Sequence, residues 1–97
     1  MLQIRAHDEI TEIQLDRAPV NAMTLELLDA LVRAHEQAIS EGARAVVISG
    51  REGLFSAGLD VPALLQQDRS GIEHFWSFFF ATMRSMANSS VPVLATR

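Results

Sequence analysis

The sequence contains no cysteine, no cluster of basic residues and no long apolar run, and each absence excludes a class of protein. Without cysteine, neither a disulfide nor a thiolate metal site can form, which fits a cytosolic or organellar protein. The 8 basic and 12 acidic residues give a formal net charge of −4, so the clustered cations that wrap nucleic acid are missing. No stretch reaches the roughly 18 apolar residues of a membrane-spanning helix. We expect no membrane span and no nucleic-acid partner.

The N-terminus also lacks a basic segment followed by an apolar one, so no signal or transit peptide is seen. We expect the protein in a bacterial cytoplasm or in the mitochondrial matrix. With 48% hydrophobic and 21% charged residues, the 97-residue chain suits a single folded domain with a modest core. No repeat, low-complexity tract or linker divides it.

Hydrophobic patterns in the first half predict an α/β protein. Alternating apolar residues at 2–6 and 10–15 predict a β-hairpin of half-buried strands. Thr24 is placed to cap a helix that ends at Gly42, with Leu28, Leu31, Val32, Ala38 and Ile39 on its apolar side. The run 45–48 is apolar on both faces, as in a central strand covered on two sides. Strand, helix and strand in this order predict a right-handed crossover in a largely parallel sheet.

The second half predicts two helices and another strand. Asp60 can cap a short helix over 61–67, and a polar interruption at 68–71 precedes a long helix from Ile72. A buried strand is expected at 91–95. The long helix carries an aromatic and apolar stripe that we expect to pack on the sheet. The alternatives are an acyl pocket or a surface for the missing half of the protein or another subunit. The stripe consists of Ile72, Phe75, Trp76, Phe79, Phe80, Met83, Met86 and Ala87.

The segment 50–61, between the central strand and the short helix, is the candidate site. Its glycines permit backbone conformations and close approaches that a Cβ forbids. Small residues at 56–58 leave room for a ligand against the main chain. The segment is either a tight strand-to-helix turn or a site where the Leu59 backbone N–H donates to an acyl oxygen.

Other polar residues favour structural roles. The histidines at 7, 35 and 74 lie in three separate segments, so a metal site is not expected, and His35 should be packed and hydrogen-bonded within the apolar stripe. The serines lack the nucleophile-elbow pattern of a serine hydrolase. Asp60 is interpreted as a helix cap rather than a general base, and Glu52 as a solvated side chain.

Four segments together resemble the N-terminal part of the crotonase family, also called the enoyl-CoA hydratase/isomerase superfamily. They are most similar to its Δ3,Δ2-enoyl-CoA isomerase branch. The resemblance implies that residues 1–97 form the N-terminal portion of a single crotonase-like domain, an incomplete ββα spiral. The segments, in family order, are Arg17-Ala18-Pro19-Val20-Asn21-Ala22-Met23, Ala45-Val46-Val47-Ile48-Ser49-Gly50, Phe55-Ser56-Ala57-Gly58-Leu59-Asp60 and Val91-Pro92-Val93-Leu94-Ala95.

The family resemblance implies an enzyme that binds an acyl-CoA thioester in fatty-acid oxidation or related acyl-CoA metabolism. Coenzyme A enters as part of the substrate, and no other cofactor and no metal is implied. Leu59 matches the first of two backbone N–H donors that hold the thioester oxygen as it becomes an enolate. The remaining matches concern coenzyme A and its acyl chain: Arg17, Ala18 and Val20 beside the CoA moiety, and Ser56, Asp60 and Val61 beside pantetheine and acyl chain.

The resemblance also implies parts that this chain lacks. The second oxyanion donor and the proton-transfer carboxylate are expected beyond the last strand, whereas the sequence ends at Ala95-Thr96-Arg97. We interpret the chain as a truncated, frameshifted or shortened product that is inactive alone and forms a homotrimer or hexamer when full length. The alternative is a non-catalytic fragment that retains part of a CoA site or acts as an interaction module.

Overall fold

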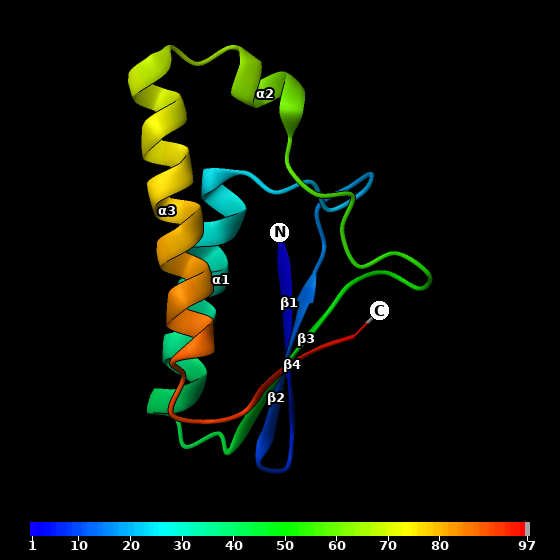
Figure 1. Cartoon of the computed structure of the whole chain (residues 1–97). Helices are drawn as coiled ribbons and strands as arrows, with labels where there is room; N and C mark the ends of the chain where they lie inside the picture. The colour runs from blue at the N-terminus through cyan, green and yellow to red at the C-terminus, as the bar shows by residue number, and fades with distance from the viewer. Residues whose placement is uncertain (97) are drawn as a thin grey trace.

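Helices and strands follow one another in the order that the hydrophobic patterns predict (Figure 1). The computed structural model describes residues 1–96, so Arg97 lies outside the described residues. The elements are β1 (Leu2–His7), β2 (Ile10–Leu15), α1 (Leu25–Ser40), β3 (Ala45–Ser49), α2 (Val61–Leu65), α3 (Arg69–Ala87) and β4 (Val93–Thr96).

The strands form one sheet in the order β1-β2-β3-β4. β1 pairs with β2 as an antiparallel hairpin in which Leu2 lies opposite Leu15, while β3 runs parallel to both β2 and β4. Parallel neighbouring strands need a crossover connection. Helix α1 forms the crossover between β2 and β3, and helices α2 and α3 form the crossover between β3 and β4. The hairpin and the largely parallel sheet are therefore confirmed.

Helix α1 supplies most of the helical side of the core. It begins as predicted, with the Thr24 hydroxyl accepting from the Leu27 N–H at 3.2 Å, and it ends before Gly42, whose φ is +92°. Its buried side is rotated from the predicted stripe, because Leu27 and Ala34 are buried whereas Val32 and Ile39 are only half-buried. The buried core cluster is Ile13, Leu15, Leu27, Leu31, Ala34, Ala38, Val46 and Ile48.

Helix α3 packs on α1 and not, as predicted, on the sheet (Figure 1). The physical reason is that α1 already covers that face of the sheet. α3 also begins earlier than expected, because Asp68 caps it by accepting from the Gly71 N–H at 2.8 Å. Phe75 is buried, but Trp76, Phe80 and Met83 on the same predicted stripe remain exposed.

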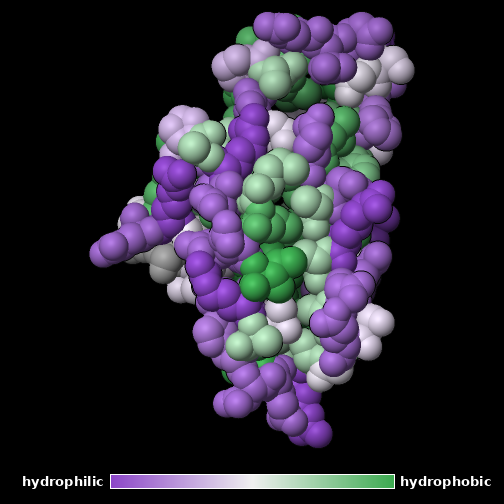
Figure 2. All heavy atoms as spheres, turned by 180° about the vertical axis from the view of Figure 1, so that it is seen from behind, coloured by the Kyte–Doolittle hydropathy of each residue, from purple (hydrophilic) through white to green (hydrophobic). Residues whose placement is uncertain are grey.

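The helices lie on one face of the sheet only (Figure 1), and this corrects three expectations of burial. On β3, Val46 is buried under α1, whereas Val47 on the opposite face is only half-buried. The outer strands β1 and β4 are mostly exposed, with Ile4 at 58% and Leu94 at 60%, because each is an edge strand. Figure 2 shows a strip of hydrophobic side chains down the middle of the face in view, with hydrophilic side chains to its left and right.

Candidate functional site

Two loops meet at the edge of the sheet where β2 and β3 end. Because these strands are parallel, their carboxyl ends lie together, and the chain leaves them as the loop 16–24 and the glycine turn 50–60. Four of the hydrogen bonds between the loops join residues 20–23 to residues 56–60. They run from Ala57 N to Val20 O (2.9 Å), from Ser56 Oγ to Asn21 O (2.7 Å), from Met23 N to Gly58 O (2.7 Å) and from Asp60 N to Met23 O (3.0 Å).

The glycine turn folds back closely on itself. A Cβ on Gly50 would lie 2.4 Å from the Phe55 Cα and 2.5 Å from its carbonyl oxygen, so only glycine fits there. Arg51 and Leu54 exchange backbone hydrogen bonds of 2.8 and 2.9 Å that close the turn. Gly58 has φ +95°, a conformation that side chains disfavour. The glycines therefore serve close approach and positive φ, as predicted.

Leu59 lies in a short extended segment paired with Met23. The carbonyl of Gly58 and the N–H of Asp60 both bond to Met23. Since peptide groups alternate direction along extended backbone, the Leu59 N–H points away from Met23. Within residues 1–96 this N–H has no hydrogen-bond acceptor.

The side chain of Asp60 is occupied on both oxygens. Its Oδ1 accepts from the Ala63 N–H at 3.1 Å and caps α2, which confirms the predicted capping role. Its Oδ2 accepts from Arg17 Nη2 at 3.3 Å, while Arg17 Nη1 donates to the Ala22 carbonyl at 3.2 Å. Asp60 is thus held as a structural group rather than as a free base.

The other predicted site residues lie around the joined loops. Ser56 is half-buried, and its hydroxyl also accepts from the Gly58 N–H at 3.0 Å. Val20 and Val61 are exposed apolar side chains. Ala18 is exposed and precedes Pro19 through a cis peptide bond. The structure therefore gathers these residues at one end of the sheet.

Asn21 is a central residue of the site that the sequence did not single out. It is completely buried, at 0% exposure, with φ +54°. Its Oδ1 accepts from the Arg17 N–H at 2.7 Å, and its Nδ2 donates to the carbonyls of Leu15 (3.1 Å) and Phe55 (3.0 Å). Asparagine tolerates positive φ better than most residues, but the sequence alone does not reveal the partner Phe55.

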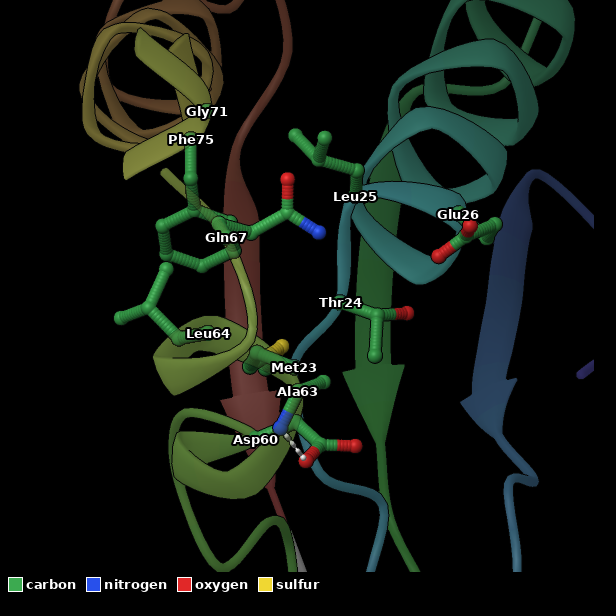
Figure 3. Close-up of a pocket in the computed structure, with 10 residues that line it drawn as sticks. All are labelled: Met23, Thr24, Leu25, Glu26, Asp60, Ala63, Leu64, Gln67, Gly71 and Phe75. Carbon is green, nitrogen blue, oxygen red and sulfur yellow. Dashed lines mark hydrogen bonds between the residues drawn. The ribbon is translucent and has the colours of Figure 1, made fainter. Parts of the chain in front are cut away.

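A pocket of about 140 Å³ lies between the first turn of α1, α2 and the start of α3 (Figure 3). Asp60 lines it, whereas Leu59 and the other predicted site residues do not in the described part of the chain. The Gln67 amide extends into the gap between α3 and α1. The residues of this lining are Met23, Thr24, Leu25, Glu26, Asp60, Ala63, Leu64, Gln67, Gly71 and Phe75.

Two further polar groups are perturbed by their surroundings. On the open face of the sheet, Glu12 accepts from Ser49 Oγ at 2.7 Å and contacts His7 Nε2 at 3.1 Å, and these hydrogen bonds lower its pKa. Between α1 and the end of α3, His35 Nε2 lies 2.9 Å from Ser89 Oγ. Burial lowers the pKa of His35, and its Nδ1 has no partner within the described residues.

Some kinds of site are missing from residues 1–96. No group of three or more histidine, cysteine, aspartate or glutamate side chains there could hold a metal ion. None of the helices in this range is long and apolar enough to cross a membrane.

Comparison with solved structures shows how widely this arrangement recurs. An enoyl-CoA hydratase from Thermoplasma volcanium GSS1 is 29% identical and superimposes with a TM-score of 0.89 over 97% of this chain and 38% of its own length. A probable enoyl-CoA hydratase from Mycobacterium tuberculosis H37Rv is 24% identical and superimposes with a TM-score of 0.89 over 97% of this chain and 40% of its own length. Human mitochondrial delta3-delta2-enoyl-CoA isomerase is 21% identical and superimposes with a TM-score of 0.89 over 97% of this chain and 38% of its own length. At these identities the last two structures show only that the fold is shared.

These matches establish the chain as the N-terminal part of the crotonase fold, spanning about two fifths of such proteins (38–40%). No curated protein is significantly similar to it in sequence. The model of the enoyl-CoA hydratase/isomerase family matches residues 5–96. That match covers nearly the whole chain, which therefore belongs to the enoyl-CoA hydratase/isomerase family.

Proposed function

We propose that the chain binds an acyl-CoA thioester whose carbonyl oxygen accepts a hydrogen bond from the Leu59 backbone N–H. The observation that carries this proposal is the Leu59 N–H itself. It points away from Met23 and lacks an acceptor within residues 1–96, although the neighbouring Asp60 N–H and Gly58 carbonyl are both bonded. A donor held in a fixed direction by its neighbours suits an oxygen that gains charge during a reaction.

The chemistry would be that of an enoyl-CoA isomerase or hydratase in fatty-acid oxidation or related acyl-CoA metabolism. When the carbon next to a thioester loses a proton, or when water adds to a 2-enoyl thioester, negative charge moves to the carbonyl oxygen as an enolate. Loss of one donor to such an oxygen costs about 3 kcal/mol in barrier height. Leu59 would supply one donor.

The remaining predicted contacts would hold the rest of the ligand. Arg17, Ala18 and Val20 would lie beside the CoA moiety, and Ser56, Asp60 and Val61 beside pantetheine and the acyl chain. The exposure of Val20 and Val61 supports this assignment, since both offer apolar surface to a ligand. Arg17 retains partial exposure of its side chain while it pairs with Asp60.

Turnover would also need a proton-transfer group. The carboxylate that adjoins Leu59 is Asp60, and both its oxygens are already bonded. We therefore propose that the 97-residue chain binds the thioester without converting it, and that conversion needs a second donor and an acid or base from elsewhere.

The test is a titration of the ¹⁵N-labelled chain with acetoacetyl-CoA, followed by amide chemical shifts. We expect the Leu59 amide to shift downfield, because its N–H gains an acceptor. Free CoA is the matched control: it should shift the amides of Arg17, Ala18 and Val20 but not that of Leu59. Calorimetry that detects no binding of either ligand would overturn the proposal. Assays with 3-enoyl-CoA and 2-enoyl-CoA should show no turnover, and rapid turnover would contradict the division between binding and conversion.

A second candidate function, an interaction module, is favoured by the surface of α3. Trp76, Phe80 and Met83 leave a large apolar area on one helix, and apolar areas of this kind mark interaction surfaces. Sedimentation velocity of the chain distinguishes the candidates, because a module that self-associates through α3 sediments faster with rising concentration and Phe80→Ser reverses that rise.

A further inference from the structure

Asn21 joins its own loop and the end of β2 to the glycine turn, where its partner Phe55 lies 34 residues further along the chain. Its carboxamide accepts from the Arg17 N–H and donates to the carbonyls of Leu15, at the end of β2, and Phe55, in the glycine turn. Its backbone N–H donates to the Arg17 carbonyl at 2.7 Å, and its own carbonyl accepts from Ser56 Oγ at 2.7 Å. Every polar atom of this fully buried residue is therefore bonded.

Only asparagine fits these contacts. Two carbonyl oxygens require two N–H donors, and the Arg17 N–H requires an acceptor on the same side chain. An aspartate of the same shape would face the carbonyls of Leu15 and Phe55 with an unfavourable negative charge, because a carboxylate has no hydrogen to donate. Buried polar groups without partners are costly.

The contacts of Asn21 lead directly to Leu59. The bond to Phe55 and the bond from Ser56 fix the turn from two sides, and Ser56 Oγ in turn accepts from the Gly58 N–H at 3.0 Å. Gly58 is the residue before Leu59, so its orientation determines where the Leu59 N–H points.

We infer that Asn21 is a positioning residue: its carboxamide sets the place of the glycine turn against the loop 16–24, and thereby the direction of the Leu59 N–H. The effect on ligand affinity rests on the proposed function, whereas the effect on the turn does not. An experiment can therefore contradict the effect of Asn21 on the turn without contradicting the proposed function, and the reverse.

The first test compares Asn21→Asp with Asn88→Asp, the same chemical change at the exposed cap of α3. At pH 7 we expect Asn21→Asp to shift the amide resonances of 55–59 and to speed their hydrogen exchange. On acidification a neutral carboxyl regains one donor, so these resonances should return toward their wild-type positions. Asn88→Asp should leave them in place at every pH. Amides 55–59 that respond equally in both variants would overturn the inference.

If Asn21→Asp does not fold at pH 7, Asn21→Gly takes its place, because glycine accepts φ +54° and keeps the backbone bond to Ser56. We expect faster exchange at 55–59 with unchanged exchange in α1. Unchanged exchange at 55–59 in this variant would refute the inference.

The ligand test uses acetoacetyl-CoA and free CoA. Losing the fixed direction of one donor should weaken acetoacetyl-CoA binding about tenfold in Asn21→Asp, with a smaller loss for free CoA, and acidification should restore part of the difference. If the wild-type chain binds neither ligand, the proposed function fails and the amide shifts alone decide the role of Asn21. Equal losses for both ligands would contradict positioning of the acyl-oxygen donor.

Discussion

The Arg17 guanidinium and the Asp60 carboxylate form an ion pair of 3.3 Å that joins the loop after β2 to the start of α2. Both side chains are partly buried, with 31% and 21% exposed, so salt screens the pair less than a fully exposed one. The pair ties the residue after Leu59 to the opposite loop.

A double-mutant cycle with Arg17→Gln and Asp60→Asn measures this pair. Asparagine caps helices as well as aspartate does, so Asp60→Asn removes the charge and keeps the cap. We expect a coupling free energy of about 0.5–1 kcal/mol from urea unfolding. The exposed pair Asp29–Arg33 on α1 is the control, with a coupling of about 0.3–0.5 kcal/mol that vanishes at high salt. A cycle in which both pairs behave alike would show that partial burial does not strengthen the Arg17–Asp60 pair.

Gly50→Ala should destabilise the chain by about 1–3 kcal/mol, because the new Cβ meets main-chain atoms that cannot rotate away. Those atoms are the Phe55 Cα and carbonyl oxygen and the Leu54 carbonyl oxygen, at 2.4–2.6 Å. Gly71→Ala is the control: its Cβ mainly meets the flexible Gln67 side chain, and alanine favours a helix over glycine by about 1 kcal/mol. Urea midpoints should fall for the first variant only. An unchanged midpoint for Gly50→Ala would mean that the turn can open without cost.

Features set by neighbours in sequence could be predicted, and those set by distant contacts could not. The caps Thr24 and Asp60 depend on hydrogen bonds three residues away, so their side-chain types reveal them. The role of Asn21 depends on its hydrogen bond to Phe55, 34 positions away, and no local sequence pattern predicts that contact. The spacing of apolar residues predicts the apolar stripe of α3, but the prediction that this stripe packs on the sheet is wrong, because α3 packs on α1. Hydrophobicity alone does not show which element a helix contacts.

Ser49→Ala should raise the pKa of Glu12, because the Ser49 hydroxyl makes the hydrogen bond that lowers it most. The contact from His7 remains in this variant, so part of the lowering should persist. A carboxyl whose folded pKa is depressed stabilises the protein above its unfolded pKa, and that contribution is lost as the pH falls through the folded pKa. The variant should therefore lose this stability at a higher pH than the wild type.

Titration of the ¹³C-labelled Glu12 carboxyl by NMR measures the change directly. Ser77→Ala, on the exposed surface of α3, is the matched control and should leave the Glu12 titration as in the wild type. A Glu12 pKa unaffected by Ser49→Ala would mean that His7 and Arg5 alone account for the lowering.

His35 should make the chain less stable in mild acid. Because burial lowers its pKa in the folded state, the unfolded chain binds a proton first, near pH 6.5. The contribution of neutral His35 to stability is therefore fully present above that pH. It falls as the pH drops below about 6.5, with a slope of at most about 1.4 kcal/mol per pH unit, until the folded pKa is passed. The contribution of Glu12 to stability changes only at lower pH, because its hydrogen bonds hold its pKa below the ordinary carboxyl value.

Urea unfolding of His35→Gln from pH 7.5 to 5.5 isolates this effect. Glutamine does not titrate and can still reach Ser89 Oγ, the partner of His35 Nε2. The variant should lose much of the slope, whereas His74→Gln, an exposed position on α3, should keep the slope of the wild type. If His35→Gln keeps the full slope, the acid sensitivity arises from groups other than His35.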